Sequence, residues 1–195
     1  MIHINKGEPW LFRPSYICDS LPENPANKYL NGQYNFSFEI EMLYEEIKKE
    51  REVIFAILPD YTGIDIYDDK LILTFDFSGN REYFELRNTL TIGNINKIKF
   101  KHIPKEYIAI IINDIVVFSK RITNLFFGNN SKDPHIIFGA GNFPINNFNL
   151  NYAEYELHLF KMYLNDEIIS HHNFKKIIHG KSFDLTDNCN FINKI

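Results

Sequence analysis

Apolar and polar residues alternate along five segments of the chain, at 36–42, 71–77, 83–87, 97–101 and 154–159. Alternation with a period of two is typical of β-strands that pack one face against a core and turn the other toward solvent or a ligand. In the first segment, for example, phenylalanines and other apolar residues alternate with a serine and two glutamates. The pattern therefore predicts a fold built mainly from half-buried strands.

Two further segments, 53–58 and 108–112, are apolar throughout. Short continuous apolar runs predict central strands that are covered on both faces. The second run is followed by Asn113 and Asp114 and then by more apolar residues, which predicts a tight hairpin with these two residues in its turn. Asn and Asp tolerate the positive φ angles that such turns require.

Two segments have features of helices. Residues 43–51 are short and highly charged, and Glu45 and Lys49 have the i, i+4 spacing that supports a helix. Residues 166–178 contain apolar residues at roughly helical spacing. We therefore expect a short helix in each, the second one after the last long strand.

The spacing of the predicted strands indicates the fold class. Strands at intervals of about ten residues, separated by turns rich in Gly, Pro and Asn, favour a β-sandwich or barrel over a fold of alternating strands and helices. We predict an all-β, two-sheet antiparallel β-sandwich with one or two short helices. The 195 residues fit one domain, and 18 Phe and 11 Tyr suit a thick core. We assign residues 1–180 to this domain, and 181–195 to a C-terminal tail, a linker or a final edge strand.

The charge pattern argues against nucleic acid as a partner. The formal net charge is −4, and no long basic run is present. A nucleic-acid binder needs clustered Lys and Arg to displace phosphate counterions. The nearest approach to a basic stripe is Lys97, Lys99 and Lys101, which share one face of a predicted strand. Their ordinary interpretation is a solvated strand face.

Membrane and secretion signals are not evident in the sequence. No stretch approaches the roughly 18 apolar residues of a transmembrane helix, so we predict no membrane partner. The first residues lack the basic and then apolar pattern of a secretory signal peptide, which leads us to expect a cytoplasmic or virion-associated protein. Cys18 and Cys189 are too few for a disulfide scaffold and are expected to be separate thiols.

The order of the segments resembles a known superfamily. Three stretches carry the resemblance: FSFEIEM at 36–42, YIAIIINDIVVFSK at 107–120, and the region from 135 to 174 that ends in YELHLFKMYLNDEIISHHNF. They resemble the concanavalin A-like lectin and glucanase superfamily, and in particular laminin-G-like domains. The resemblance implies a jelly roll that most commonly binds carbohydrate, although such domains also bind proteins or act as spacers. The chain departs from it where the usual turn glycine is missing after Asp114.

The same superfamily includes enzymes, whose motifs are incomplete in this chain. Glucanases of this fold carry Glu-x-Asp-x-x-Glu on one strand; Glu39 and Glu41 begin a similar pattern, but Tyr44 occupies the position of the second catalytic Glu. Retaining hydrolysis needs two carboxylates about 5 Å apart. Lyases of this fold carry a catalytic Tyr where this chain has Phe143, which has no hydroxyl. We therefore lean toward a protein that is not an enzyme and predict no catalytic residue.

Several carboxylates are nevertheless expected on outward strand faces, where two from neighbouring strands could act as acid and base. The alternative is a set of ordinary solvated surface acids. These residues are Glu39, Glu41, Glu85, Glu154 and Glu156.

Two consecutive loops combine amides with aromatic rings. Asn129 and Asn130 lie in the first loop, and Asn142, Phe143 and Asn146 lie in the second. Amides pair with sugar hydroxyls, and an aromatic face stacks on the C–H face of a sugar ring. We therefore take these five residues as candidates for ligand binding. The alternative is that they are ordinary loop-forming residues.

Acidic residues gather in one loop-strand region, around Tyr61 and Asp65 together with Asp60, Asp68 and Asp69. Carboxylates from such loops can hold calcium, and some laminin-G-like domains bind calcium. The spacing matches no calcium-loop signature, so turn residues and surface acids are the alternative. Tyr61 and Asp65 are the ligand-binding candidates here; calcium is the one candidate cofactor, and the metal ligands are left unassigned.

These observations lead to three hypotheses on function. The first is a non-enzymatic carbohydrate-binding module of a phage tail or of surface-polysaccharide machinery, with a glycan or polysaccharide as its partner. The second is a structural or protein-interaction jelly roll in a virion or a larger enzyme, with a protein partner or a homo-oligomer. The third is a divergent glycoside hydrolase or polysaccharide lyase.

Overall fold

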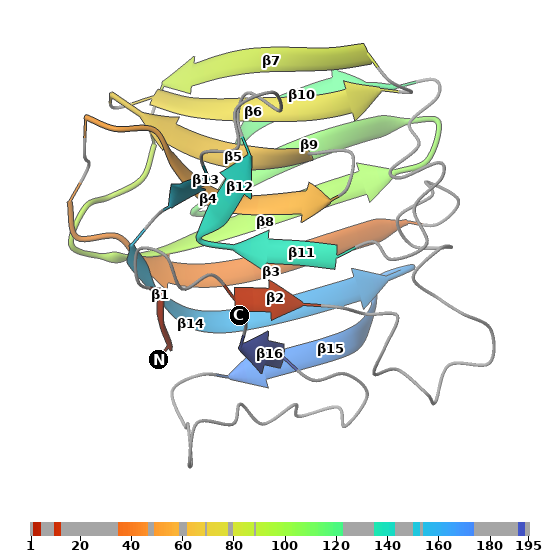
Figure 1. The fold of residues 1–195 in the computed structure, drawn as a ribbon. Helices are drawn as coiled ribbons and strands as arrows, with labels where there is room; N and C mark the ends of the chain where they lie inside the picture. The colour runs from red at the N-terminus through yellow and green to blue at the C-terminus, as the bar shows by residue number, and fades with distance from the viewer. Residues whose placement is uncertain are drawn as a thin grey trace.

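A computed structural model gives the arrangement of the chain (Figure 1). The residues it describes are 2–4, 10–12, 35–46, 49–58, 62–68, 70–77, 80–87, 89–122, 135–142, 150–152, 154–173 and 191–193. Cys18 and Cys189 lie outside them. Among the described residues, no helix has the length and apolar character needed to cross a membrane.

Within the described part of the chain, the first sheet has seven antiparallel strands. Its order is β1 (Ile2–Ile4), β14 (Tyr155–Leu164), β3 (Phe36–Leu43), β8 (Ile95–Ile103), β9 (Tyr107–Ile112) and β10 (Ile115–Arg121), and β15 (Glu167–Asn173) also pairs with β14. Strands β3 and β14 thus pair although more than a hundred residues separate them in the sequence.

The second sheet also has seven antiparallel strands among the described residues. Its order is β16 (Phe191–Asn193), β2 (Trp10–Phe12), β11 (His135–Phe138), β4 (Glu52–Leu58), β5 (Thr62–Tyr67), β6 (Lys70–Phe77) and β7 (Asn80–Arg87). A small pair, β12 (Ala140–Asn142) and β13 (Leu150–Tyr152), contacts β4. In Figure 1 the second sheet lies in front of the first, so the outward face of the first sheet points away from the viewer.

The predicted fold class is confirmed, because the described residues form two antiparallel sheets that pack as a β-sandwich. The alternating segments lie in β3, β6, β7, β8 and β14, and the two apolar runs lie in β4 and β9. The hairpin between β9 and β10 turns at Asn113 and Asp114, whose φ angles are 50° and 65°. The apolar residues of the alternating strands face the core, as their period requires.

The helix predicted at 43–51 is wrong for the residues that the structure describes. Leu43 ends β3, and residues 44–46 are irregular. The Tyr44 side chain is fully buried and its hydroxyl donates a hydrogen bond to the Glu52 carboxylate. The Tyr44 carbonyl accepts a hydrogen bond of 2.9 Å from the Gly93 N–H. Burial of Tyr44 outweighs one i, i+4 pair, which stabilises a helix by only about 0.5 kcal/mol.

The helix predicted at 166–178 is also wrong, because residues 167–173 form strand β15. Asn165 and Asp166 make the turn from β14 into β15, with φ angles of 47° and 66°. They repeat the dipeptide of the 113–114 hairpin and adopt the same left-handed backbone. Residues 174–178 lie outside the described part of the chain.

Phenylalanines join the two sheets in the core. Phe38 of β3 stacks on Phe100 of the neighbouring β8, with ring centroids 5.4 Å apart. On its other side Phe38 meets Phe55 of the second sheet edge-on at 4.8 Å. A second contact between the sheets joins Phe138 and Phe160 at 5.5 Å. Such aromatic pairs contribute about 0.5–1.5 kcal/mol each beyond the area they bury.

A buried hydrogen bond also crosses between the sheets. The Tyr155 hydroxyl at the start of β14 donates to the Ile54 carbonyl of β4, with an O···O distance of 2.6 Å. Burial raises the pKa of Tyr155 well above its ordinary value of 10.0, and the Gly139 N–H opposes this shift only in part. The folded protein therefore requires the protonated form of this tyrosine.

We predict that Tyr155→Phe lowers the free energy of unfolding by about 1 kcal/mol near neutral pH, since it removes one hydrogen bond. A raised pKa in the folded state contributes stability below the unfolded pKa, and that contribution is lost as pH rises toward the folded pKa. The difference in the free energy of unfolding between wild type and Tyr155→Phe should therefore shrink above pH 10.0 and then reverse sign. Urea denaturation at several pH values measures it. Tyr83→Phe, at a half-exposed tyrosine, is the control, and a difference for Tyr155→Phe that stays constant with pH would contradict the prediction.

Candidate functional site

The outward face of the first sheet carries a set of charged side chains from three adjacent strands. Glu39 of β3 lies between Lys99 of β8 and Lys161 of β14, directly across the ladder from both. Lys97 and Lys101 flank Lys99 on the same face, because residues two apart on a strand point the same way. We call the outward-facing residues Glu39, Lys97, Lys99, Lys101 and Lys161 the lysine face.

Glu39 is largely covered although it is charged and faces outward, with its side chain only 7% exposed. Its carboxylate lies 3.4 Å from the Lys97 ammonium and 4.0 Å from the Lys161 ammonium. The Lys99 ammonium lies over the Tyr163 ring, 4.9 Å from its centroid, so the Lys99 side chain reaches across β3 toward β14. The aliphatic part of a lysine side chain can extend over a neighbouring residue while its ammonium group remains at the surface, and the lysines around Glu39 cover it in this way.

The charges on this face shift two pKa values. Glu39, and to a smaller extent Asp114, raise the pKa of Lys97, while partial burial opposes the shift. Burial and then the Glu39 carboxylate raise the pKa of Tyr163, and Lys97 opposes. At neutral pH, Lys97 is therefore charged, and the Tyr163 hydroxyl is protonated and can donate a hydrogen bond to a ligand.

An amide network anchored by the buried Asn96 holds the hairpin turn beside Lys97. The Asn113 side chain accepts from the Lys97 N–H at 2.9 Å and donates to the Asn96 amide oxygen at 3.0 Å. Asn96 is fully buried and donates to the carbonyls of Thr91 and Asn94, at 2.9 Å each. The turn is thereby fixed so that the exposed Asp114 carboxylate lies 3.6 Å from the Lys97 ammonium.

These residues border a groove of about 260 Å³. Its lining combines charged groups with two aliphatic side chains, and consists of Glu39, Lys97, Lys99, Ile111, Asp114 and Val116. Ligand pockets for small molecules are typically about 300–1,000 Å³. The groove therefore has room for one or two small rings rather than for a long chain.

Most of the ligand-binding residues predicted from the sequence lie outside the described part of the chain: Tyr61, Asn129, Asn130, Phe143 and Asn146. The backbone of Asn142 ends β12 and pairs with Leu150, and its side chain is not described. The role of these residues therefore stays a prediction.

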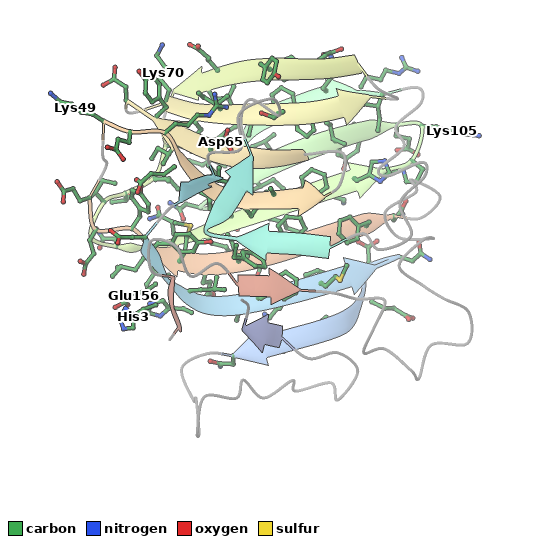
Figure 2. The ribbon with its side chains drawn as sticks, viewed as in Figure 1. His3, Lys49, Asp65, Lys70, Lys105 and Glu156 are labelled. Atoms are coloured by element: carbon green, nitrogen blue, oxygen red, sulfur yellow. The ribbon has the colours of Figure 1, made fainter. Side chains whose placement is uncertain are left out.

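Asp65 is described, and its side chain is fully buried in the second sheet (Figure 2). Its carboxylate accepts a hydrogen bond of 2.8 Å from the Arg51 Nε and a second one from Nη2. In this structure it therefore does not reach a ligand at the surface. Asp68 is exposed in a turn, with φ of 45°. The described residues contain no cluster of three or more His, Cys, Asp or Glu that could hold a metal, so calcium stays a prediction.

The carboxylates considered for acid–base chemistry are divided between the two sheets. Glu39 and Glu41 lie on β3, whereas Glu85 lies on β7 and pairs with Lys70 at 2.9 Å. Glu156 lies near two histidines, 3.6 Å from His3 and 3.1 Å from His158. Tyr44, which replaces the second catalytic residue of the glucanase-like motif, is buried in the core. The motif therefore points no second carboxylate toward Glu39.

Sequence reasoning named Lys97, Lys99 and Glu39 but did not connect them, and it did not identify Lys161, Tyr163 or the aliphatic residues as neighbours. The available signal was the complementary charge of two alternating segments. Glutamates at 39 and 41 match lysines at 97 and 99 when β3 and β8 pair, and opposite charges across a ladder are mutually stabilising.

The chain resembles several solved structures. It aligns with domains LG4-5 of the mouse laminin alpha1 chain at 10% identity and a TM-score of 0.58, over 93% of this chain and 46% of that one. A mutant of HCR/D aligns at 14% identity and a TM-score of 0.55, over 86% of this chain and 40% of the HCR/D chain. A heptameric SAP-like pentraxin from Limulus polyphemus aligns at 12% identity and a TM-score of 0.51, over 84% of this chain and 71% of the pentraxin chain. The chain spans less than half of the laminin and HCR/D structures.

No family model and no curated protein matches the chain. At such low identities the structural likeness shows the fold alone. The chain shares with these structures the concanavalin A-like jelly-roll fold, as the resemblance in the sequence implied.

We predict that Arg51→Met lowers the free energy of unfolding by roughly 3–5 kcal/mol, because it removes the guanidinium that offsets the buried Asp65 charge. Lys70→Met removes the same charge from an exposed pair with Glu85 in the same sheet and should change stability little. Urea denaturation of both variants makes the comparison. Equal losses for the two would show that the Arg51–Asp65 pair has no special structural role.

Proposed function

We propose that the chain is a non-enzymatic carbohydrate-binding module that holds a saccharide in the groove on the outward face of the first sheet. The observation that carries this proposal is the mixed lining of the groove. The jelly-roll fold is compatible with it but does not by itself determine a ligand.

The lining matches the chemistry of a sugar ring, which has hydroxyl groups at its edge and C–H groups on its faces. Glu39 and Asp114 can accept hydrogen bonds from hydroxyls, and Lys97 and Lys99 can donate to them. Ile111 and Val116, which pair across β9 and β10, offer an aliphatic surface to the C–H face. A purely charged or purely apolar groove would match only one of these two features.

The groove walls come from paired strands and from the tight turn of one hairpin. Ile111 pairs directly with Lys99, and the Asn113 network anchors the turn that carries Asp114. The backbone of paired strands is already ordered, so binding requires less ordering of the chain than at a site built from loops, which favours affinity. We further propose a setting in a phage tail or in surface-polysaccharide machinery, which a bacterial polysaccharide ligand would support.

A broad array of glycans and bacterial polysaccharides, probed with and without calcium, tests the proposal. Specific saccharide binding is the expected result, and its loss on calcium removal would add a cation to the site. We predict that Val116→Trp, which fills the groove, weakens that binding at least about tenfold, or about 1.4 kcal/mol.

The matched control is Ile168→Trp, which places the same ring at an exposed apolar position on β15 of the same sheet. It should leave affinity within about twofold, since it lies outside the groove lining. Either of two results rejects the proposal: no saccharide binds in either condition, or the two tryptophan variants weaken binding equally.

A protein-interaction role is the second candidate, favoured by the exposed apolar residues of β10. Ile115 and Val116 are 65% and 59% exposed, at the edge of the first sheet. Exposed apolar edge strands are templates for pairing with another chain. Analytical ultracentrifugation over a range of concentrations tests this role, and a monomer at every concentration would argue against self-association.

A further inference from the structure

Carboxylates neutralise some lysines of the lysine face and not others. Lys97 contacts both Glu39 and Asp114, and Lys161 contacts Glu39. Within the part of the chain that the structure describes, neither Lys99 nor Lys101 has a carboxylate within ion-pair distance. Lys99 instead lies over the Tyr163 ring. Positive charge is thus left over at one end of the face, in a chain whose net charge is −4.

The neighbours of these two lysines leave that charge accessible. Lys101 lies between Ser37 and Ala109 across the ladder, and both are small and uncharged. Lys99 lines the groove between Ile111 on its β9 side and Glu39 on its β3 side, and the Glu39 carboxylate lies near the ammonium groups of Lys97 and Lys161. Because Lys99 and Lys101 are two residues apart on one strand, both ammonium groups can approach a single anionic group.

The two carboxylates of the groove both lie beside Lys97, although the Glu39 residue itself is paired with Lys99. Glu39 is held by two lysines, and Asp114 lies at the hairpin turn beside Lys97. An anion placed there would be repelled by both carboxylates, whereas neutral hydroxyls would be accepted. The carboxylates beside Lys97 and the pair formed by Lys99 with Lys101, which lies on β8 just beyond the groove lining, therefore favour different parts of one ligand.

We propose that the ligand is a saccharide carrying an acidic group, which binds at Lys99 and Lys101 while its neutral hydroxyls face Glu39 and Asp114. This inference rests on the proposed carbohydrate-binding function and specifies its ligand class. A carboxylate and a sulfate ester share the required chemistry, and the experiment separates them.

The test uses the full chain on an array of matched neutral, uronate-bearing and sulfated oligosaccharides, including cellobiose and cellobiuronic acid, with single-stranded DNA as a further polyanion. The best-binding saccharide is then measured by calorimetry at low and high salt. We expect it to be acidic, to bind at least about tenfold more tightly than its neutral counterpart, and to weaken as salt screens the lysines.

The variant Lys99→Gln/Lys101→Gln should lose that preference, and each single variant should lose part of it. Lys105→Gln is the matched control, because it removes the same charge from a residue that projects at the turn between β8 and β9 (Figure 2). It should keep affinity within about twofold. Unchanged thermal melting of the double variant separates lost binding from lost folding.

The outcomes distinguish the two proposals. If neutral saccharides bind as well as acidic ones and the double variant changes nothing, carbohydrate binding stands and the acidic ligand is rejected. If no saccharide binds, both proposals fail. Equal binding of DNA and acidic saccharides would show a general polyanion surface and reject the inference. A preference for uronates or for sulfates identifies the acidic group.

Discussion

The pairing of β3 with β8 sets both the interior of this protein and its most distinctive surface. On the inner face it stacks Phe38 on Phe100, and Phe38 then contacts Phe55 of the opposite sheet. On the outer face the same register sets Glu39 opposite Lys99. A slip of one residue would exchange the two faces and force charged side chains into the core. Burial of the phenylalanines therefore fixes the positions of the charges.

Much of the fold could be predicted because the strands carry a strong local signal. Alternation identified the two strands of this pair, and the dipeptide at 113–114 identified a turn. The same dipeptide at 165–166 is a weaker turn signal, since the apolar residues after it also fit a helical spacing. Period alone does not separate a short strand from a short helix. Residues 167–173 form a strand because they pair with β14, and the local sequence alone does not predict that pairing.

The lysine face and its groove were harder to predict, because their residues are far apart in the sequence. Lys161 and Tyr163 join Glu39 only because β14 pairs with β3, which brings together residues more than a hundred positions apart. The hairpin turn adds Asp114 through the buried amide of Asn96. Loops rich in asparagine give a stronger sequence signal, because loops commonly carry binding residues. Charged faces of paired strands give no such local signal, since most of them are simply solvated.

Glu39 determines how the lysine face presents its charge. A nearly buried carboxylate costs desolvation energy that a neutral side chain would not, and Lys97 and Lys161 offset that cost by approaching it. The positive charges of Lys97 and Lys161 are then largely neutralised within the face. Among the described residues, no carboxylate lies within ion-pair distance of Lys99 or Lys101. A face with the same lysines and no Glu39 would attract any polyanion in any orientation. The asymmetry, more than the number of lysines, would allow the proposed site to distinguish one acidic group on a sugar from a uniformly charged polymer.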